Sequence, residues 1–150
     1  MSKKYKNNNY NNNSNSLNLN IEELNGKKVT LNNDKNKYLV VYPGDMNFLV
    51  MLDDLIKYIT SEYEKIQNTE DNEVEDTYVE RLNNVRGLVS EIKNRFNKIF
   101  NDTTAYDRIF GNVADISLMV MVITRVFEYV AELREQENGI TDKYTSKYTN

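Results

Sequence analysis

Carboxylates are the only clustered side chains in this chain that could do acid–base or metal chemistry. Histidine and cysteine are both absent from its 150 residues, which removes the commonest general base, the commonest metal ligand and all thiolate chemistry. The best local pair, Asp53 and Asp54, is sequential, so on a helix the two side chains point about 100° apart. The acidic run at 70–76 has five carboxylates but lacks the turning glycine and the ligand spacing of a calcium loop. We therefore predict no catalytic site, no metal and no cofactor, and we interpret the run as a solvated charged surface.

Other classes of function are disfavoured by composition. The glycines are isolated, so they form no phosphate-binding loop, and without histidine or cysteine the usual nucleophilic triads cannot be assembled. The net charge is −4, and no basic stripe is present that could neutralise nucleic-acid phosphates. The most apolar run, around 116–122, is shorter than the roughly 20 residues that cross a bilayer. No signal peptide is visible at the start. We expect a soluble protein that is not an enzyme.

The strongest positive signal is apolar surface on the last predicted helix, which begins near residue 113. Its main stripe and a second stripe on the far side both recur at helical spacing. A small chain has few neighbours with which to bury a helix on all sides. The second stripe either packs beneath a sheet or forms an adaptable, methionine-containing surface for a partner or for self-association. The main stripe contains Ile116, Met119, Val120, Ile123, Phe127 and Val130, and the second contains Leu118, Met121 and Val122.

A polar break precedes that helix. Residues 101–104 interrupt the chain and offer caps for a short helix over 105–110, which Gly111 closes. Asn112 is the predicted cap of the last helix, with Asp115 in a capping-box position, and Gly139 is its predicted end. Phe110, at the end of the short helix next to Gly111, is either an anchor in the core or a contact for a partner.

Two longer helices are predicted upstream. Asp45 has the side chain of an N-cap, and apolar residues follow at helical spacing to predict a helix over 46–67. The next helix, 74–100, has a seam with 4-3 spacing, which is long enough for antiparallel pairing inside a bundle or for a dimer. We interpret the seam as intramolecular, and self-association remains the alternative. The seam contains Tyr78, Leu82, Val85, Val89, Ile92, Phe96 and Ile99.

The N-terminal part predicts a small sheet. Residues 1–16 are rich in asparagine and are expected to be a disordered tail. Alternation over 17–25, a turn at Asn25-Gly26, and β-type runs at 28–31 and 38–42 predict two or three antiparallel strands. The expected fold is therefore α+β and mainly helical, with an N-terminal antiparallel β-meander packed on three main helices and one short helix. The single domain spans 17–139, and 140–150 is a polar tail.

This arrangement resembles the tail assembly chaperones of phages and prophages of low-GC Gram-positive bacteria. The likeness covers about residues 18–136 and consists of an arrangement of elements plus one short motif. Its residues are the turn Leu24-Asn25-Gly26-Lys27, the helix end at Phe96, Ile99 and Phe100, the loop 101–104, the closure Ile109-Phe110-Gly111, and Phe127-Glu128-Tyr129-Val130.

The resemblance implies a non-enzymatic protein of the host bacterial cytoplasm that is absent from the mature virion. Such a protein keeps the helical tape-measure protein soluble and recruits tail-tube subunits. The alternative is a structural minor tail or connector subunit that stays in the particle and self-associates through the 78–99 seam. A DNA-binding regulator is disfavoured by the acidity of the chain. The candidate partner-binding residues are Phe110, Leu118, Met119, Met121, Val122 and Arg125.

Overall fold

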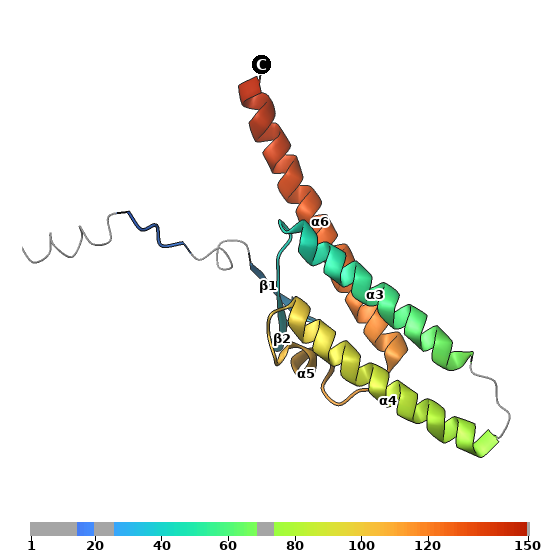
Figure 1. Ribbon diagram of the computed structural model, residues 1–150. Coiled ribbons are helices and arrows are strands. Elements are labelled where there is room, and N and C mark those ends of the chain that lie inside the picture. The colour runs from blue at the N-terminus through green and yellow to red at the C-terminus, as the bar shows by residue number, and fades with distance from the viewer. Residues whose placement is uncertain (1–14, 20–25, 69–73, 150) are drawn as a thin grey trace, which may run out of the picture.

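The computed structural model describes residues 15–19, 26–68 and 74–149, and three long helices dominate it (Figure 1). Within these residues the elements are β1, β2, α3, α4, α5 and α6 in chain order. Figure 1 shows the hairpin and the short helix α5 gathered beside the C-terminal half of α4. The predicted mainly helical α+β fold is confirmed. The bounds are β1 Lys27–Leu31, β2 Asp34–Val41, α3 Met46–Gln67, α4 Val74–Ile99, α5 Ala105–Phe110 and α6 Ile116–Thr149.

The sheet is an antiparallel hairpin in which Val29 of β1 pairs with Leu39 of β2. Its reversal is at Asn32 and Asn33, whose φ angles of 54° and 59° are those of a tight two-residue turn. Asparagine tolerates this left-handed region better than most residues, so two residues are enough for the turn and β2 begins at Asp34, before the predicted run 38–42. The predicted first strand falls largely outside the described residues, as does Asn25 of its turn. Its described part, residues 17–19, is not in a strand.

Helix α3 has the predicted bounds and the predicted cap. The Asp45 carboxylate accepts a hydrogen bond from the Asn47 N–H at 2.9 Å, which satisfies one of the free donors of the first turn. Phe48 is fully buried, whereas the neighbouring Leu49 is only half-buried. The apolar face of α3 packs on both α4 and α6. Its buried residues are Phe48, Leu52, Leu55 and Ile59.

Helix α4 pairs with α3 inside the molecule, as predicted, but only along part of the seam. Ile92 and Phe96 are fully buried, whereas Tyr78 and Leu82 are 60% and 50% exposed. The reason is that α3 ends too early to cover the start of α4. Ile66, in the last turn of α3, lies opposite residues 84–88, so the first turns of α4 extend beyond the end of α3 (Figure 1).

Helix α6 differs from its prediction at both ends. The cap is Asp115, whose carboxylate accepts from the Leu118 N–H at 3.1 Å, so the prediction of Asn112 as the cap is wrong. Gly139 was predicted to end the helix, but α6 continues to Thr149. Gly139 does not have the positive φ of a glycine C-cap, and one glycine inside a helix costs only about 1 kcal/mol. Among the described residues, no helix is long and apolar enough to span a membrane.

An aromatic cluster joins α3, α4 and α5 at the centre of the core. The Phe96 ring lies 4.7 Å from Phe100, 5.5 Å from Phe110 and 6.2 Å from Tyr106, measured between centroids. Phe48 of α3 adds an edge-on contact to Phe100 at 5.5 Å. Such ring pairs add about 0.5–1.5 kcal/mol each to the burial of their area. This cluster fixes where α5, and through it the hairpin, can lie.

Candidate docking groove

The loop before α5 is held by the side chain of Asn97. Its amide oxygen accepts from the Tyr106 N–H at 2.8 Å, and its amide nitrogen donates to the Thr103 carbonyl at 3.0 Å. The Asp102 carboxylate then accepts from the N–H and the hydroxyl of Thr104 at 2.9 and 2.8 Å. These bonds satisfy free backbone groups where α4 ends and α5 begins. The bend at residues 101–104, between the two helices, therefore has one defined geometry.

Arg108 connects this bend to the hairpin. Its Nε donates to the Tyr38 carbonyl of β2 at 2.9 Å, and its guanidinium lies 3.9 Å from the centre of the Tyr38 ring. A second guanidinium nitrogen donates to Asp102 at 2.7 Å. The hydrogen bond from Arg108, followed by that from the Thr104 N–H, holds the pKa of Asp102 below its usual value. No spacing pattern in the sequence marks the contact of Arg108 with the hairpin, because Tyr38 lies 70 residues away in the chain.

The base of the hairpin is tied separately to α6. Lys27 Nζ lies 3.1 Å from Glu137 Oε1, and Arg134 donates to the Pro43 carbonyl at 3.1 Å. The hairpin is therefore anchored to α6 at its base and to α5 at β2. Between these two attachments, the inner face of the sheet and the side of α6 do not close on each other.

The space that remains is a groove of about 640 Å³ between the hairpin and α6. One wall of the groove, here called the sheet bank, is the inner face of the hairpin. Because side chains alternate along a strand, Val29, Leu31, Leu39 and Val41 all lie on this face. The other bank is a face of α6 at spacings of three and four residues. The residues that line the groove are Lys28, Val29, Thr30, Leu31, Asn32, Asn33, Leu39, Val41, Met121, Val122, Arg125, Val126 and Tyr129.

Three of the six predicted partner-binding residues line this groove. Met121 is 55% exposed and Arg125 is exposed, while Val122 is half-buried against the core. Leu118 is half-buried and is not among the lining residues. The second stripe of α6 is therefore neither sealed in the core nor fully open, and Met121 is its most accessible member.

The other two predicted residues belong to the core. Phe110 is buried, and its ring centre lies 5.0 Å from that of Tyr106, so it is the anchor of the bend. Met119 is fully buried, and its sulfur lies 3.8 Å from the Tyr106 hydroxyl. Burial raises the pKa of that hydroxyl, and the neighbouring charge of Asp107 adds to the effect. The sulfur of Met119 is therefore not available to a partner in this structure.

The sequence analysis allowed that the second stripe packs beneath a sheet, but it named no residue of the sheet, and not Tyr129, as a candidate for partner binding. The alternation of Val29, Leu31, Leu39 and Val41 does indicate one apolar face of a hairpin. It does not indicate which helix that face meets, because this depends on the ties made by Arg108 and by Lys27.

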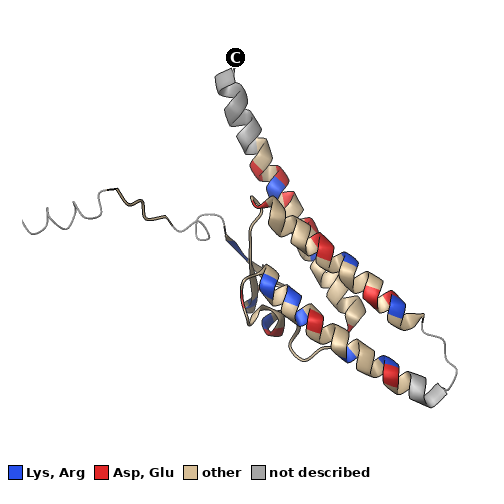
Figure 2. Cartoon of the chain, viewed as in Figure 1, with Lys and Arg blue, Asp and Glu red and all other residues tan. Residues whose placement is uncertain are grey.

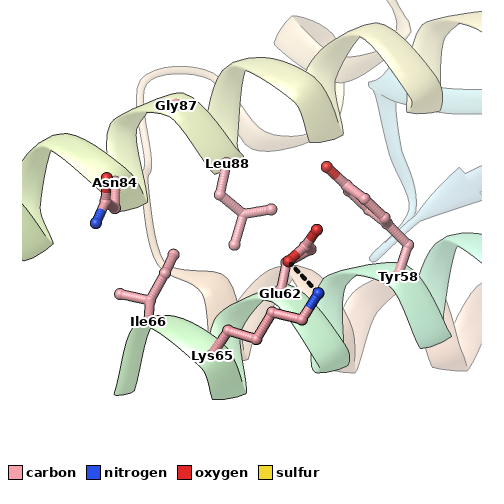
Figure 3. Close-up of a pocket in the computed structure, with 7 residues that line it drawn as sticks. All are labelled: Tyr58, Glu62, Lys65, Ile66, Asn84, Gly87 and Leu88. Carbon is pink, nitrogen blue, oxygen red and sulfur yellow. Dashed lines mark ion pairs between the residues drawn. The ribbon is translucent and has the colours of Figure 1, made fainter. Parts of the chain in front are cut away.

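A second, smaller hollow lies between α3 and α4 (Figure 3). It holds about 380 Å³. Gly87 leaves its α4 wall without a side chain, while Leu88 points into it. Its charged groups, Glu62 and Lys65, neutralise each other as an ion pair at 3.3 Å. Among the described residues, no group of three or more acidic side chains is arranged to hold a metal ion.

Charges of both signs are scattered along α3 and α4 (Figure 2), so neither helix presents a uniform field to a partner. On the α6 side of the groove the charged side chain is Arg125, whereas Lys28 alternates with Val29 and its ammonium lies 4.3 Å from the centre of the Tyr38 ring. Comparisons of this chain with family models, with curated proteins and with solved structures give no match.

Proposed function

We propose that this protein is an assembly chaperone that holds an amphipathic helix of a client protein in the groove between the hairpin and α6. The observation that carries the proposal is the position of Met121, which is 55% exposed and lines the same groove as the half-buried apolar side chains of Val29 and Leu31. Single exposed apolar residues are ordinary on protein surfaces. An exposed methionine and tyrosine that continue into an apolar hollow are typical of an interaction site.

The shape and chemistry of the groove favour a helix as the ligand. The lining residues of α6 follow one helical face from Met121 to Tyr129, and the sheet provides a second wall along it. Recognition of a helix in a groove uses anchors at successive turns, which two such walls can accept. Methionine adapts to side chains of different shape, which suits a protein that must cover a long, repetitive helix.

The resemblance to phage and prophage tail assembly chaperones suggests the client. On this proposal the client is the tape-measure protein, with tail-tube subunits as a second partner. The protein would act in the host bacterial cytoplasm and would not remain in the mature virion. A tape-measure protein exposes long amphipathic helices, which aggregate unless their apolar faces are covered.

Co-expression with the tape-measure protein of the same genome tests the proposal. The variant Met121→Asp places a charge in the groove, and Met46→Asp places the same charge on an equally accessible methionine of α3, which is 62% exposed and does not line the groove. We expect the client to be soluble with the native chain and with Met46→Asp, and to precipitate with Met121→Asp. A client that is equally insoluble with and without the native chain would overturn the proposal.

A structural tail or connector subunit is the second candidate, and the exposed start of α4 favours it. Tyr78, Val79 and Leu82 are exposed where α4 continues past α3. A second copy could cover this surface. Sedimentation velocity should then show self-association that Leu82→Glu abolishes, and mass spectrometry should detect the chain in purified particles. A monomer at high concentration, absent from particles, would exclude this candidate.

A further inference from the structure

The outer edge of β1 is open, whereas the outer edge of β2 is occupied. The Tyr38 carbonyl of β2 accepts a hydrogen bond from Arg108 of α5, so it points away from β1. In an antiparallel ladder, two opposite residues either bond to each other or both point their backbone groups outward. Thr30 is opposite Tyr38, so its N–H and carbonyl point outward, and those of Lys28, two residues away, do the same. Among the described residues, neither backbone has a hydrogen-bond partner outside the hairpin.

The groove follows this open edge. Its lining contains every residue from 28 to 33, although side chains alternate between the two faces of a strand, so the groove reaches the backbone of β1 at its edge. The nearby lysines are held away from that edge. The Lys27 ammonium pairs with Glu137 of α6 at 3.1 Å, and the Lys28 ammonium lies 4.3 Å from the centre of the Tyr38 ring on the outer face. An edge lysine is a common protection against the addition of a strand, and neither lysine provides it here.

The α6 side of the groove has a row of exposed residues along the same space. Met121 is 55% exposed, Arg125 is exposed and Tyr129 is 47% exposed, and successive members of the row are one helical turn apart. A sheet of only two strands is marginal, and a third strand beside β1 would widen its inner face over α6. The space along β1 therefore has both the backbone groups and the apolar surface that an extended segment requires.

The chain itself contains a segment with the matching pattern. Leu17 and Leu19 are 81% and 60% exposed, and residues 15–19 are not in a helix or a strand. In an extended conformation the two leucines point to one side, and Ser16 and Asn18 point to the other. This is the alternation of a strand that has one apolar and one polar face.

We infer that residues 15–19, here called the N-terminal arm, add as a strand to β1 of a second copy and place Leu17 and Leu19 in its groove. In a single copy the arm is exposed while the edge of β1 is open, so the two complementary features do not meet within one chain. Exchange of the same element between two copies satisfies both features at two equivalent sites. The outward backbone groups of Lys28 and Thr30 supply the hydrogen bonds, as is usual when a strand is added to a sheet. The inference goes beyond the proposed function and does not depend on a client.

Sedimentation velocity of the full chain tests the inference. The native chain should form a dimer. The double variant Leu17→Asp with Leu19→Asp puts charges on the apolar side of the arm and should weaken dimerisation about tenfold or more. The control, Ser16→Asp with Asn18→Asp, puts the same charges on the polar side and should leave dimerisation within about twofold of the native value. Thr30→Pro removes the outward N–H at an edge position that tolerates proline, and it should also weaken dimerisation.

A mixture of two defective chains gives a sharper test. The Leu17→Asp, Leu19→Asp chain keeps an intact groove, and Met121→Asp keeps an intact arm. Each should be monomeric alone, because neither can form both contacts of the dimer. Together they should associate through the one contact that remains, with the arm of one chain in the groove of the other. Circular dichroism checks that each variant is folded.

The outcomes separate this inference from the proposed function. A native chain that stays monomeric at high concentration would overturn the exchange of arms. A dimer that Leu82→Glu abolishes and Leu17→Asp with Leu19→Asp leaves intact would also overturn it, because the contact would then belong to α4. The proposed function fails separately, since the client assay reports solubility of another protein. The chain with the two leucines replaced should still keep the client soluble, because its groove is unchanged.

Discussion

Replacement by alanine should lower the free energy of unfolding strongly at Met119 of α6 and hardly at all at Met121, two residues further on. Met119 is fully buried and contacts the Tyr106 hydroxyl, whereas Met121 is 55% exposed at the groove. Truncation of a buried methionine to alanine removes its apolar burial and leaves a cavity, which typically costs 2–5 kcal/mol. For Met119→Ala we expect a loss of about 3 kcal/mol, which is a large share of the roughly 5–15 kcal/mol that stabilises a domain.

The Met121→Ala variant should change the free energy of unfolding by about 0.5 kcal/mol or less, because the side chain is more than half solvated and alanine is a strong helix former. Urea titration followed by circular dichroism measures both values, and thermal melts should place Met119→Ala roughly 10 °C below the native protein. Binding of the client should weaken only for Met121→Ala when both variants are folded. Equal losses of stability at the two positions, or a larger loss at Met121, would refute the assignment of one face of α6 to the core and the other to the groove.

Three further predictions concern the bend and the turn. Phe110→Ala should cost about 3–5 kcal/mol in urea titrations because the ring is part of the aromatic cluster, and a loss below 1 kcal/mol would mean that this ring is not an anchor. Asp102→Asn should cost about 1 kcal/mol near neutral pH. Because the folded-state pKa of Asp102 lies below its unfolded value, the gap from the native protein should close as the pH falls below about 4, and a gap that persists at pH 2 would contradict the role of Arg108. Asn33→Val should destabilise the hairpin by about 1–2 kcal/mol because φ is 59°, whereas Asn33→Gly should be neutral or stabilising; equal thermal melts for the two would rule out a strained turn.

The helices could be predicted because their signals are local. The cap at Asp45 and the apolar spacing that follows it define α3, and the polar break at 101–104 with Gly111 defines α5. The end of α6 could not be predicted, because a glycine ends a helix only where the backbone turns to positive φ, and Gly139 does not. The distinction between a glycine that caps and one that is merely tolerated is not visible in the residue type.

Only the α6 side of the groove could be predicted from the sequence. The periodicity of α6 separates Met119 from Met121 as members of two stripes, and the structure places the first in the core and the second at the surface. The opposite bank depends on contacts between residues far apart in the chain, such as Arg108 with the Tyr38 carbonyl. No pattern along one segment encodes such a contact, so the residues that the sheet contributes to the groove could not be derived from the sequence.

The packing of α3 against both α4 and α6 sets an order of events during synthesis on the ribosome. The nascent chain exposes α3 first, can pair it with α4 next, and can complete its burial only when α6 has left the exit tunnel. At translation speeds of about 5–20 residues per second, Leu52 and Ile59 wait for several seconds before their last neighbours arrive. A chain interrupted before α6 would therefore expose part of the apolar face of α3, the same kind of aggregation-prone amphipathic helix that the finished protein is proposed to cover.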